Sequence, residues 1–336
     1  MNLTPIVLYN NTSSASPAPF QQMLIIPANT SINSTYTNIR FRDGNYKLLT
    51  SWLESYTTSS ATIWIVLPNG ISSKSAMTIY METGNLSDNF LDGVTVGEAP
   101  QLSPTYAEYD DGASVFGYYE DFVGSGLPSG WQELTSSGDT YTWDNGISFT
   151  NNGNGDYVSI GTTSAVSPAG ILELGITSGS NARPTIELAT TDTQIEGGQP
   201  IYMYEDGYGQ SYGMFSGNMQ FEILTTSYSD IANSKTAYNA PIIEGIAWTA
   251  TGSQLLEIVP NYNYNSMETV SETNAAVSLS TPLYIMLGQA ASGSTSDTGG
   301  FTASWLRTRA YPPNGTMPIQ VNKLSSIENI IEGLII

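Results

Sequence analysis

The chain has 336 residues, with nine Lys and Arg against thirty Asp and Glu, no histidine and no cysteine. The missing His and Cys exclude serine–histidine triads, thiolate nucleophiles, His/Cys zinc sites and disulfide bonds. The formal net charge of −21 repels polyanions and argues against nucleic acid as a partner, and no stretch reaches the roughly 20 apolar residues of a membrane span.

The first 99 residues are predicted to form a β-sandwich. Short apolar or alternating runs are separated by Gly, Pro, Asn and Asp, which is the pattern of an all-β fold. The run 61–67 is rich in β-branched and aromatic residues, which favours the centre of a sheet. The predicted strands are 5–9, 22–26, 39–42, 46–52, 61–67 and 76–81.

Residues 100–115 are predicted to be a linker, because Pro100, Pro104 and the Asp110-Asp111-Gly112 turn interrupt the pattern. A second β-rich domain over 116–313 follows. Its number of short strands fits a two-sheet jelly roll better than a barrel. The predicted strands are 116–122, 141–150, 157–160, 171–176, 185–189, 201–204, 219–225, 242–249, 255–260, 282–289 and 303–311.

The tail, 314–336, is predicted to contain a short amphipathic helix that is too short to be stable alone. Ser325 and Glu328 form a capping box, and apolar residues follow at helical spacing. Three roles stay open: docking on its own domain, burial against other subunits, or donation of a strand. The candidate oligomerisation residues are Leu324, Ile327, Ile330, Ile331 and Leu334.

Two stretches resemble a known architecture of secreted archaeal and bacterial proteins. Residues 38–44 (NIRFRDG), 48–54 (LLTSWLE), 61–68 (ATIWIVLP) and 78–85 (TIYMETGN) resemble a small β domain of unknown function. Glu82-Thr83 stands where that family usually has aromatic residues. Residues 118–131 and 303–313 are similar to the first and last strands of the laminin-G or concanavalin-like jelly roll that follows it. The resemblance implies a fold, not an activity.

The acidic residues do not predict an enzyme. A glycoside hydrolase needs two carboxylates across one cleft, whereas Glu173, Glu187 and Glu222 are isolated on separate predicted strands. An aspartic peptidase needs two Asp-containing loops, whereas Asp297-Thr298-Gly299 occurs once. We therefore expect a protein without catalytic residues.

Tyrosine clusters predict glycan binding, because exposed rings stack on sugars while neighbouring amides bond their hydroxyls. The alternative is that these rings pack in the sandwich with their hydroxyls in water. The candidates are Tyr202, Tyr204, Tyr208 and Tyr212, crowded together, and Tyr262 and Tyr264, which alternate with asparagines.

No cofactor is predicted apart from a structural calcium ion, which the resemblance to laminin-G-like jelly rolls implies. Oxygen ligands suit this ion, and protonation at low pH would weaken the site. The acids near the first strand of the jelly roll are Asp110, Asp111, Glu120 and Asp121.

Seven Asn-x-Ser/Thr sequons predict a glycosylated protein with an exposed surface. They begin at Asn2, Asn10, Asn11, Asn29, Asn33, Asn85 and Asn314.

The charge balance suggests an acidic, extracellular setting. Below about pH 3 most carboxylates are protonated, which leaves nine fixed cations and a small positive charge. We expect a structural or adhesion protein of a virion exterior or of an archaeal surface appendage, which self-associates or binds other surface proteins. Strand-like sequence from Thr4 onward, instead of a leader, favours the virion. The alternatives are a secreted glycan-binding module and an acid glycoside hydrolase or peptidase.

Overall fold

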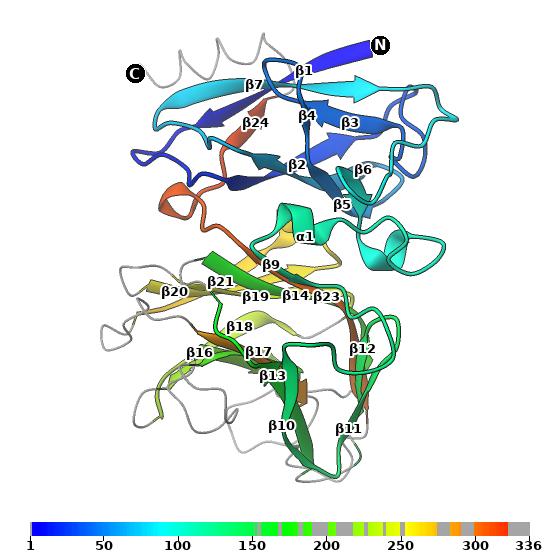
Figure 1. The fold of residues 1–336 in the computed structure, drawn as a ribbon. Coiled ribbons are helices and arrows are strands. Elements are labelled where there is room, and N and C mark those ends of the chain that lie inside the picture. The colour runs from blue at the N-terminus through cyan, green and yellow to red at the C-terminus, as the bar shows by residue number, and fades with distance from the viewer. Residues whose placement is uncertain are drawn as a thin grey trace. The chain divides into compact units, whose positions relative to one another are not determined.

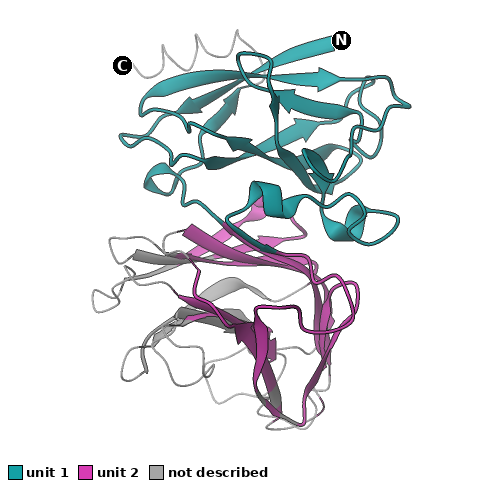
Figure 2. Cartoon of the chain, in the orientation of Figure 1, with its two compact units in different colours: residues 1–119, 309–336 teal, residues 120–308 magenta. Residues whose placement is uncertain are grey.

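The computed structural model describes residues 2–150, 152, 156–166, 170–180, 184–189, 201–205, 218–224, 228–237, 240–248, 253–273, 283–289 and 299–321. The fold is all-β, as predicted, and the chain divides into two compact units (Figures 1 and 2). Unit 1 comprises Met1–Tyr119 with Arg309–Ile336, and unit 2 comprises Glu120–Thr308. No helix within the described ranges is long and apolar enough to cross a membrane.

Unit 1 is a sandwich of two sheets. The five-stranded sheet has the order β24-β1-β7-β3-β4 and the four-stranded sheet the order β2-β6-β5-β8. The strands are β1 (Asn2–Asn10), β2 (Phe20–Pro27), β3 (Ile39–Arg42), β4 (Leu48–Leu49), β5 (Ser51–Tyr56), β6 (Ser60–Leu67), β7 (Ser75–Thr83), β8 (Val96–Glu98) and β24 (Ile319–Val321). Three short helices accompany them in the described residues: η1 (Pro100–Leu102), α1 (Gly112–Val115) and η3 (Pro313–Gly315).

The core of unit 1 is built from alternate residues of strands in both sheets. Ile63 and Ile65 of β6 belong to the same buried cluster as Leu8 of β1 and Ile79 of β7. Each such side chain stabilises the fold by about 1.5–3 kcal/mol when fully buried. The run predicted for the centre of a sheet is β6, which lies between β2 and β5.

The predicted linker, 100–115, is part of unit 1. The Nε2 of Gln21 on β2 donates to the carbonyl of Val115 at 3.0 Å, and this bond is buried. The Phe116 ring meets the Trp52 ring edge-on, with centroids 5.2 Å apart. The segment lacks strand periodicity, yet its polar groups and aromatic rings pack against β2 and β5.

The C-terminal segment closes unit 1 by bonding to both sheets. β24 pairs antiparallel with β1, with Gln320 opposite Leu8. The side chain of Gln320 bonds to β2 of the other sheet as a neighbouring strand would. Its Oε1 accepts from the N–H of Ile25 at 2.8 Å, and its Nε2 donates to the Ile25 carbonyl at 3.0 Å. We call residues 309–321 the C-terminal strap. The predicted border at 313–314 therefore falls inside unit 1.

Replacing Gln320 by alanine should lower the free energy of unfolding of unit 1 by about 1–3 kcal/mol, because both backbone groups of Ile25 lose their partner. Ile319→Ala is the matched control on the same strand, since its side chain is exposed. Denaturant titrations of both variants measure the effect. Equal stability of the two variants would contradict this role of the strap.

Unit 2 has two larger sheets. The seven-stranded sheet has the order β10-β13-β22-β15-β16-β17-β18, and the eight-stranded sheet follows β11-β12-β23-β14-β19-β20-β21, with β9 added. The strands of the first are β10 (Trp131–Ser137), β13 (Tyr157–Thr162), β15 (Pro184–Ala189), β16 (Ile201–Glu205), β17 (Asn218–Leu224), β18 (Tyr228–Ala237) and β22 (Tyr284–Gln289). Those of the second are β9 (Tyr118–Glu120), β11 (Thr140–Trp143), β12 (Ile147–Thr150), β14 (Gly170–Ser180), β19 (Ile242–Trp248), β20 (Ser253–Pro260), β21 (Glu268–Thr273) and β23 (Gly300–Arg309), and η2 is Tyr264–Ser266.

A buried ion pair joins two strands of the eight-stranded sheet. The Nε of Arg307 on β23 donates to Oε2 of Glu173 on β14 at 2.6 Å, and both side chains are 0% exposed. The guanidinium also lies 4.4 Å from the centroid of the Trp305 ring. Since a buried charge is tolerated only when paired, this pair is a structural requirement of unit 2.

The predicted tail helix and its apolar residues, from Leu324 to Leu334, lie outside the described residues.

Candidate functional site

The seven-stranded sheet of unit 2 aligns tyrosines with carboxylates. In the register of β15, β16 and β17, Tyr202 lies between Glu187 and Glu222. Two residues along, Tyr204 lies between Thr185 and Gln220. Neighbours in register share one face of a sheet. We call these six positions the tyrosine–carboxylate face.

Glu187 and Glu222 lie on separate strands, as predicted, but the register places them in one row across the sheet. Their strands lie one on each side of β16, so the backbone positions of Glu187 and Glu222 are about 9–10 Å apart. Glu187 itself is fully buried. Sequence periodicity did not find this arrangement, because it does not give the order of strands in a sheet.

Thr185 and Glu187, the two residues that β15 contributes to this row, are both buried, so the register alone does not define a surface open to a sugar. Of the other predicted candidates in this region, Tyr208 and Tyr212 lie outside the described residues.

Tyr262 and Tyr264 are placed elsewhere, beside the eight-stranded sheet. Their segment is a turn followed by η2, with a φ of 54° at Tyr262. The Tyr262 hydroxyl donates to the carbonyl of Ile176 at 3.1 Å, and Arg307 donates to the Tyr264 hydroxyl at 3.0 Å. Both half-buried tyrosines therefore support the packing of unit 2.

Asp110 and Asp111, two of the predicted calcium ligands, serve unit 1. Both oxygens of Asp110 accept hydrogen bonds, from Nε1 of Trp52 at 2.7 Å and from the Tyr119 hydroxyl at 2.8 Å. Asp111 is 5% exposed, and burial, together with the charges of Asp110 and Asp92, raises its pKa to about 8. A carboxyl group that holds its proton at neutral pH is a poor ligand for a cation.

The other two acids also fail to complete a calcium site. Glu120 accepts from the N–H of Phe122 at 3.2 Å, and burial with the charge of Asp121 raises its pKa to about 7. Asp121 accepts from the N–H of Val123 at 3.0 Å. In the part of the chain that the structure describes, no group of three or more Asp or Glu is placed to hold a metal ion.

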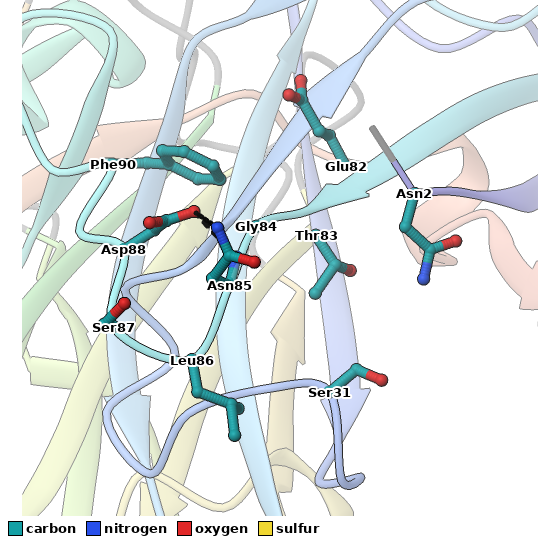
Figure 3. A pocket seen from close by; sticks show the side chains of 10 residues that line it. All are labelled: Asn2, Ser31, Glu82, Thr83, Gly84, Asn85, Leu86, Ser87, Asp88 and Phe90. Atoms are coloured by element: carbon teal, nitrogen blue, oxygen red, sulfur yellow. Dashed lines mark hydrogen bonds between the residues drawn. The ribbon is translucent and has the colours of Figure 1, made fainter.

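Unit 1 has an open hollow of about 860 Å³ at the end of β7. It is lined by the end of β7, by the loop from Gly84 to Phe90, and by Asn2 and Ser31 (Figure 3). Asp88 fixes this loop, since its Oδ2 accepts from the backbone N–H of Asn85 at 2.7 Å and from its Nδ2 at 3.1 Å (Figure 3). A Cβ at Gly84 would lie 2.6 Å from the Asp88 carboxylate, so the loop requires glycine there.

Charge at the hollow is balanced by two arginines. Arg40 donates to Glu82 through Nε at 2.9 Å and Nη2 at 2.8 Å, and the Nε of Arg42 donates to Oε2 at 2.6 Å. These bonds, with that of Arg40 the largest cause, lower the pKa of Glu82. Arg40 also lies 4.4 Å from the centroid of the Phe90 ring. The position at which the sequence departs from the family it resembles is therefore an ion-pair centre, which the sequence did not reveal.

Comparison with known proteins supports the resemblance in unit 1. Residues 35–98 match the family described as "Domain of unknown function (DUF2341)". The chain is also 38% identical over 129 residues to "Uncharacterized protein 562" of Sulfolobus islandicus rod-shaped virus 1, which is 35% of this chain and 22% of that protein. The chain thus spans about a fifth of the length of this viral relative.

Solved structures align with somewhat more than half of the chain at low identity. A winged bean acidic lectin bound to methyl-α-D-galactose aligns at 7% identity over 57% of this chain and 97% of its own, with a TM-score of 0.44. Apo Crh5 transglycosylase aligns at 16% identity over 58% and 85%, with a TM-score of 0.42. A β-1,3-glucanase from Mycobacterium marinum aligns at 11% identity over 57% and 98%, also at 0.42. TM-scores below 0.5 identify neither a ligand nor a reaction for this chain.

Proposed function

We propose that the protein is a non-enzymatic structural or adhesion protein of a virion exterior that works in an acidic medium. The observation that carries the proposal is the 38% identity over 129 residues to a protein of a rod-shaped archaeal virus. The all-β architecture supports it, since two paired-sheet units with large buried cores give a durable scaffold. An archaeal surface appendage is the alternative setting.

Immunoelectron microscopy of the native source tests this proposal, with an antibody raised against unit 1. We expect gold label on the outside of intact virions. Label on cellular filaments would show that the protein belongs to a surface appendage and not to a virion. Label found only on soluble material would overturn both proposed settings.

Glycan binding by unit 2 is a second candidate, and the register that places Tyr202 and Tyr204 on one face of β16 supports it. In an adhesion protein, such a face would bind surface carbohydrate of a host or a neighbouring particle. The net charge of −21 suits neutral or amino sugars, because a negative protein repels sulfated and uronic ones.

Glycan arrays at pH 3 and pH 7 test this candidate. We expect Tyr202→Ala to bind about tenfold more weakly than the wild type, which corresponds to about 1.4 kcal/mol. Tyr56→Ala, at an exposed tyrosine of unit 1, should bind like the wild type. An array without hits at either pH removes the candidate. Turnover of a bound polysaccharide, lost in Glu187→Gln, would instead make the protein a hydrolase.

A further inference from the structure

The sequons are distributed unevenly between the two units. Of the 25 asparagines in the chain, 13 belong to unit 1 and 12 to unit 2. All seven sequons belong to unit 1, and none occurs in residues 120–308, although Ser and Thr are common there too. Composition alone does not explain this difference.

The structure gathers the sequons at the two ends of β1. Asn2, at the start of β1, lines the hollow together with Asn85, and the hydroxyl residues of two sequons, Ser31 and Ser87, line it as well (Figure 3). Asn33 reaches the same loop, since its Nδ2 lies 3.4 Å from the Leu86 carbonyl. This group includes the sequons at Asn2, Asn29, Asn33 and Asn85.

The second group lies at the other end of β1. Asn10 is the last residue of this strand and Asn11 follows it. The Nδ2 of Asn314, in the C-terminal strap, donates to Oγ of Ser13 at 3.0 Å, and Ser13 is the hydroxyl residue of the Asn11 sequon. A nine-residue strand spans about 30 Å, so the two groups are well separated.

Burial and hydrogen bonds divide the sequons into those that can carry a sugar and those that cannot. Asn10 is 0% exposed, and its Nδ2 donates to the carbonyls of Ser14 at 2.9 Å and Ile71 at 3.1 Å. Because N-linkage replaces one of these two hydrogens and adds a bulky group, a modified Asn10 is incompatible with the fold. The Nδ2 of half-buried Asn33 is held by three acceptors, Oγ1 of Thr37 at 2.9 Å and the carbonyls of Leu86 and Asp88 at 3.4 Å. The Nδ2 groups of Asn85 and Asn314 each make one such bond, which leaves a second hydrogen for the linkage. Asn11 is also half-buried, and the exposed members are Asn2, Asn29, Asn85 and Asn314.

We propose that Asn2, Asn29, Asn85 and Asn314 carry N-linked glycans, so that unit 1 bears carbohydrate at both ends of β1 while unit 2 is bare. In this modification, Nδ2 of the asparagine bonds to C1 of an oligosaccharide carried on a lipid pyrophosphate. The bond from C1 to the pyrophosphate oxygen breaks, the lipid pyrophosphate leaves, and Nδ2 loses one proton. The proposal rests on an extracellular or virion setting, but it does not require a particular one.

Site mapping by mass spectrometry tests the proposal on protein purified from its native source. We expect glycopeptides at the four exposed asparagines and an unmodified Asn10. Unmodified peptides at all four sites, or a glycan on Asn10, would overturn it. Virions that carry the protein without glycans would reject this inference and leave the proposed function intact.

A matched pair of variants, expressed in the native host, isolates one site. Ser87 is exposed, so neither substitution disturbs the core. Ser87→Ala removes the sequon at Asn85 and should lower the intact mass by one glycan, whereas Ser87→Thr keeps the sequon and should keep the mass. Equal masses for the two variants, after correction for the side chains, would show that Asn85 is unmodified.

Discussion

Replacing Arg307 by methionine is expected to destabilise unit 2 by about 3–5 kcal/mol at pH 7, because the change leaves the carboxylate of Glu173 buried without its cation. The two side chains are both 0% exposed and are joined at 2.6 Å. The loss of the bond from Arg307 to Tyr264 adds to the effect. Calorimetry, read on the transition of unit 2, measures it.

Two further variants separate the effect of the unpaired Glu173 carboxylate from the other effects of the substitution. Arg42→Met removes an arginine that is 18% exposed from a carboxylate that keeps Arg40, so it should cost no more than about 1 kcal/mol. Adding Glu173→Leu to Arg307→Met should recover part of the loss, since no unpaired charge remains. A cost below 1 kcal/mol for Arg307→Met alone would contradict the structural role of the pair.

Acidification from pH 8 to pH 5 is expected to stabilise unit 1 by several kcal/mol, with Asp111 as the main cause. Its pKa is about 8 in the folded protein against an ordinary 3.8, so the folded state binds the proton more tightly. The stability is fully present below the ordinary value and is lost as the pH rises through 8. Buried Glu98 in unit 1, and half-buried Glu120 and buried Glu244 in unit 2, have raised pKa values and act in the same direction on their own units.

The variant Asp111→Asn should flatten this dependence, because the amide mimics the protonated acid at every pH. Denaturant titrations between pH 5 and pH 8 measure the slope. Glu108→Gln, at an exposed acid nearby, should change it far less than Asp111→Asn, because Glu108 acts only through the smaller effect of its charge on Glu98. A wild-type unit 1 that is less stable at pH 5 than at pH 8 would contradict the assignment. At still lower pH the gain reverses in part, because the pKa of Glu82 is lowered and its ion pairs are lost as it is protonated.

The local pattern predicted most strands but not their partners. The run 61–67 corresponds to β6, Ser60–Leu67, and the run 5–9 to the centre of β1, Asn2–Asn10, because alternation and β-branching are local properties. β24 is three residues long and pairs with a strand some 300 residues away, so no local signal marks it. The tyrosine–carboxylate face could not be predicted for the same reason, because the strand order β15-β16-β17 brings Glu187 and Glu222 into one row.

The candidate site shows a second limit, which concerns packing. Asp110 and Asp111 look alike in the sequence, yet one carboxylate accepts the Trp52 indole N–H and the other is buried with a raised pKa. Tyr264 looks like a ligand-binding residue until the partner of its hydroxyl, Arg307, is known. Residue type predicts which chemistry is available, whereas burial decides whether that chemistry is used.

The C-terminal strap also sets the order in which the nascent chain can fold. Its strand β24 begins at Ile319, so the ribosome adds it after every residue of unit 2. Residues 99–318 separate the end of β8 from β24, and translation proceeds at about 5–20 residues per second. During the tens of seconds before β24 is synthesised, the edge of β1 has unpaired backbone groups, which can pair with strands of other chains. Unit 2 can therefore complete its sheets first, and unit 1, although begun earlier, is finished last.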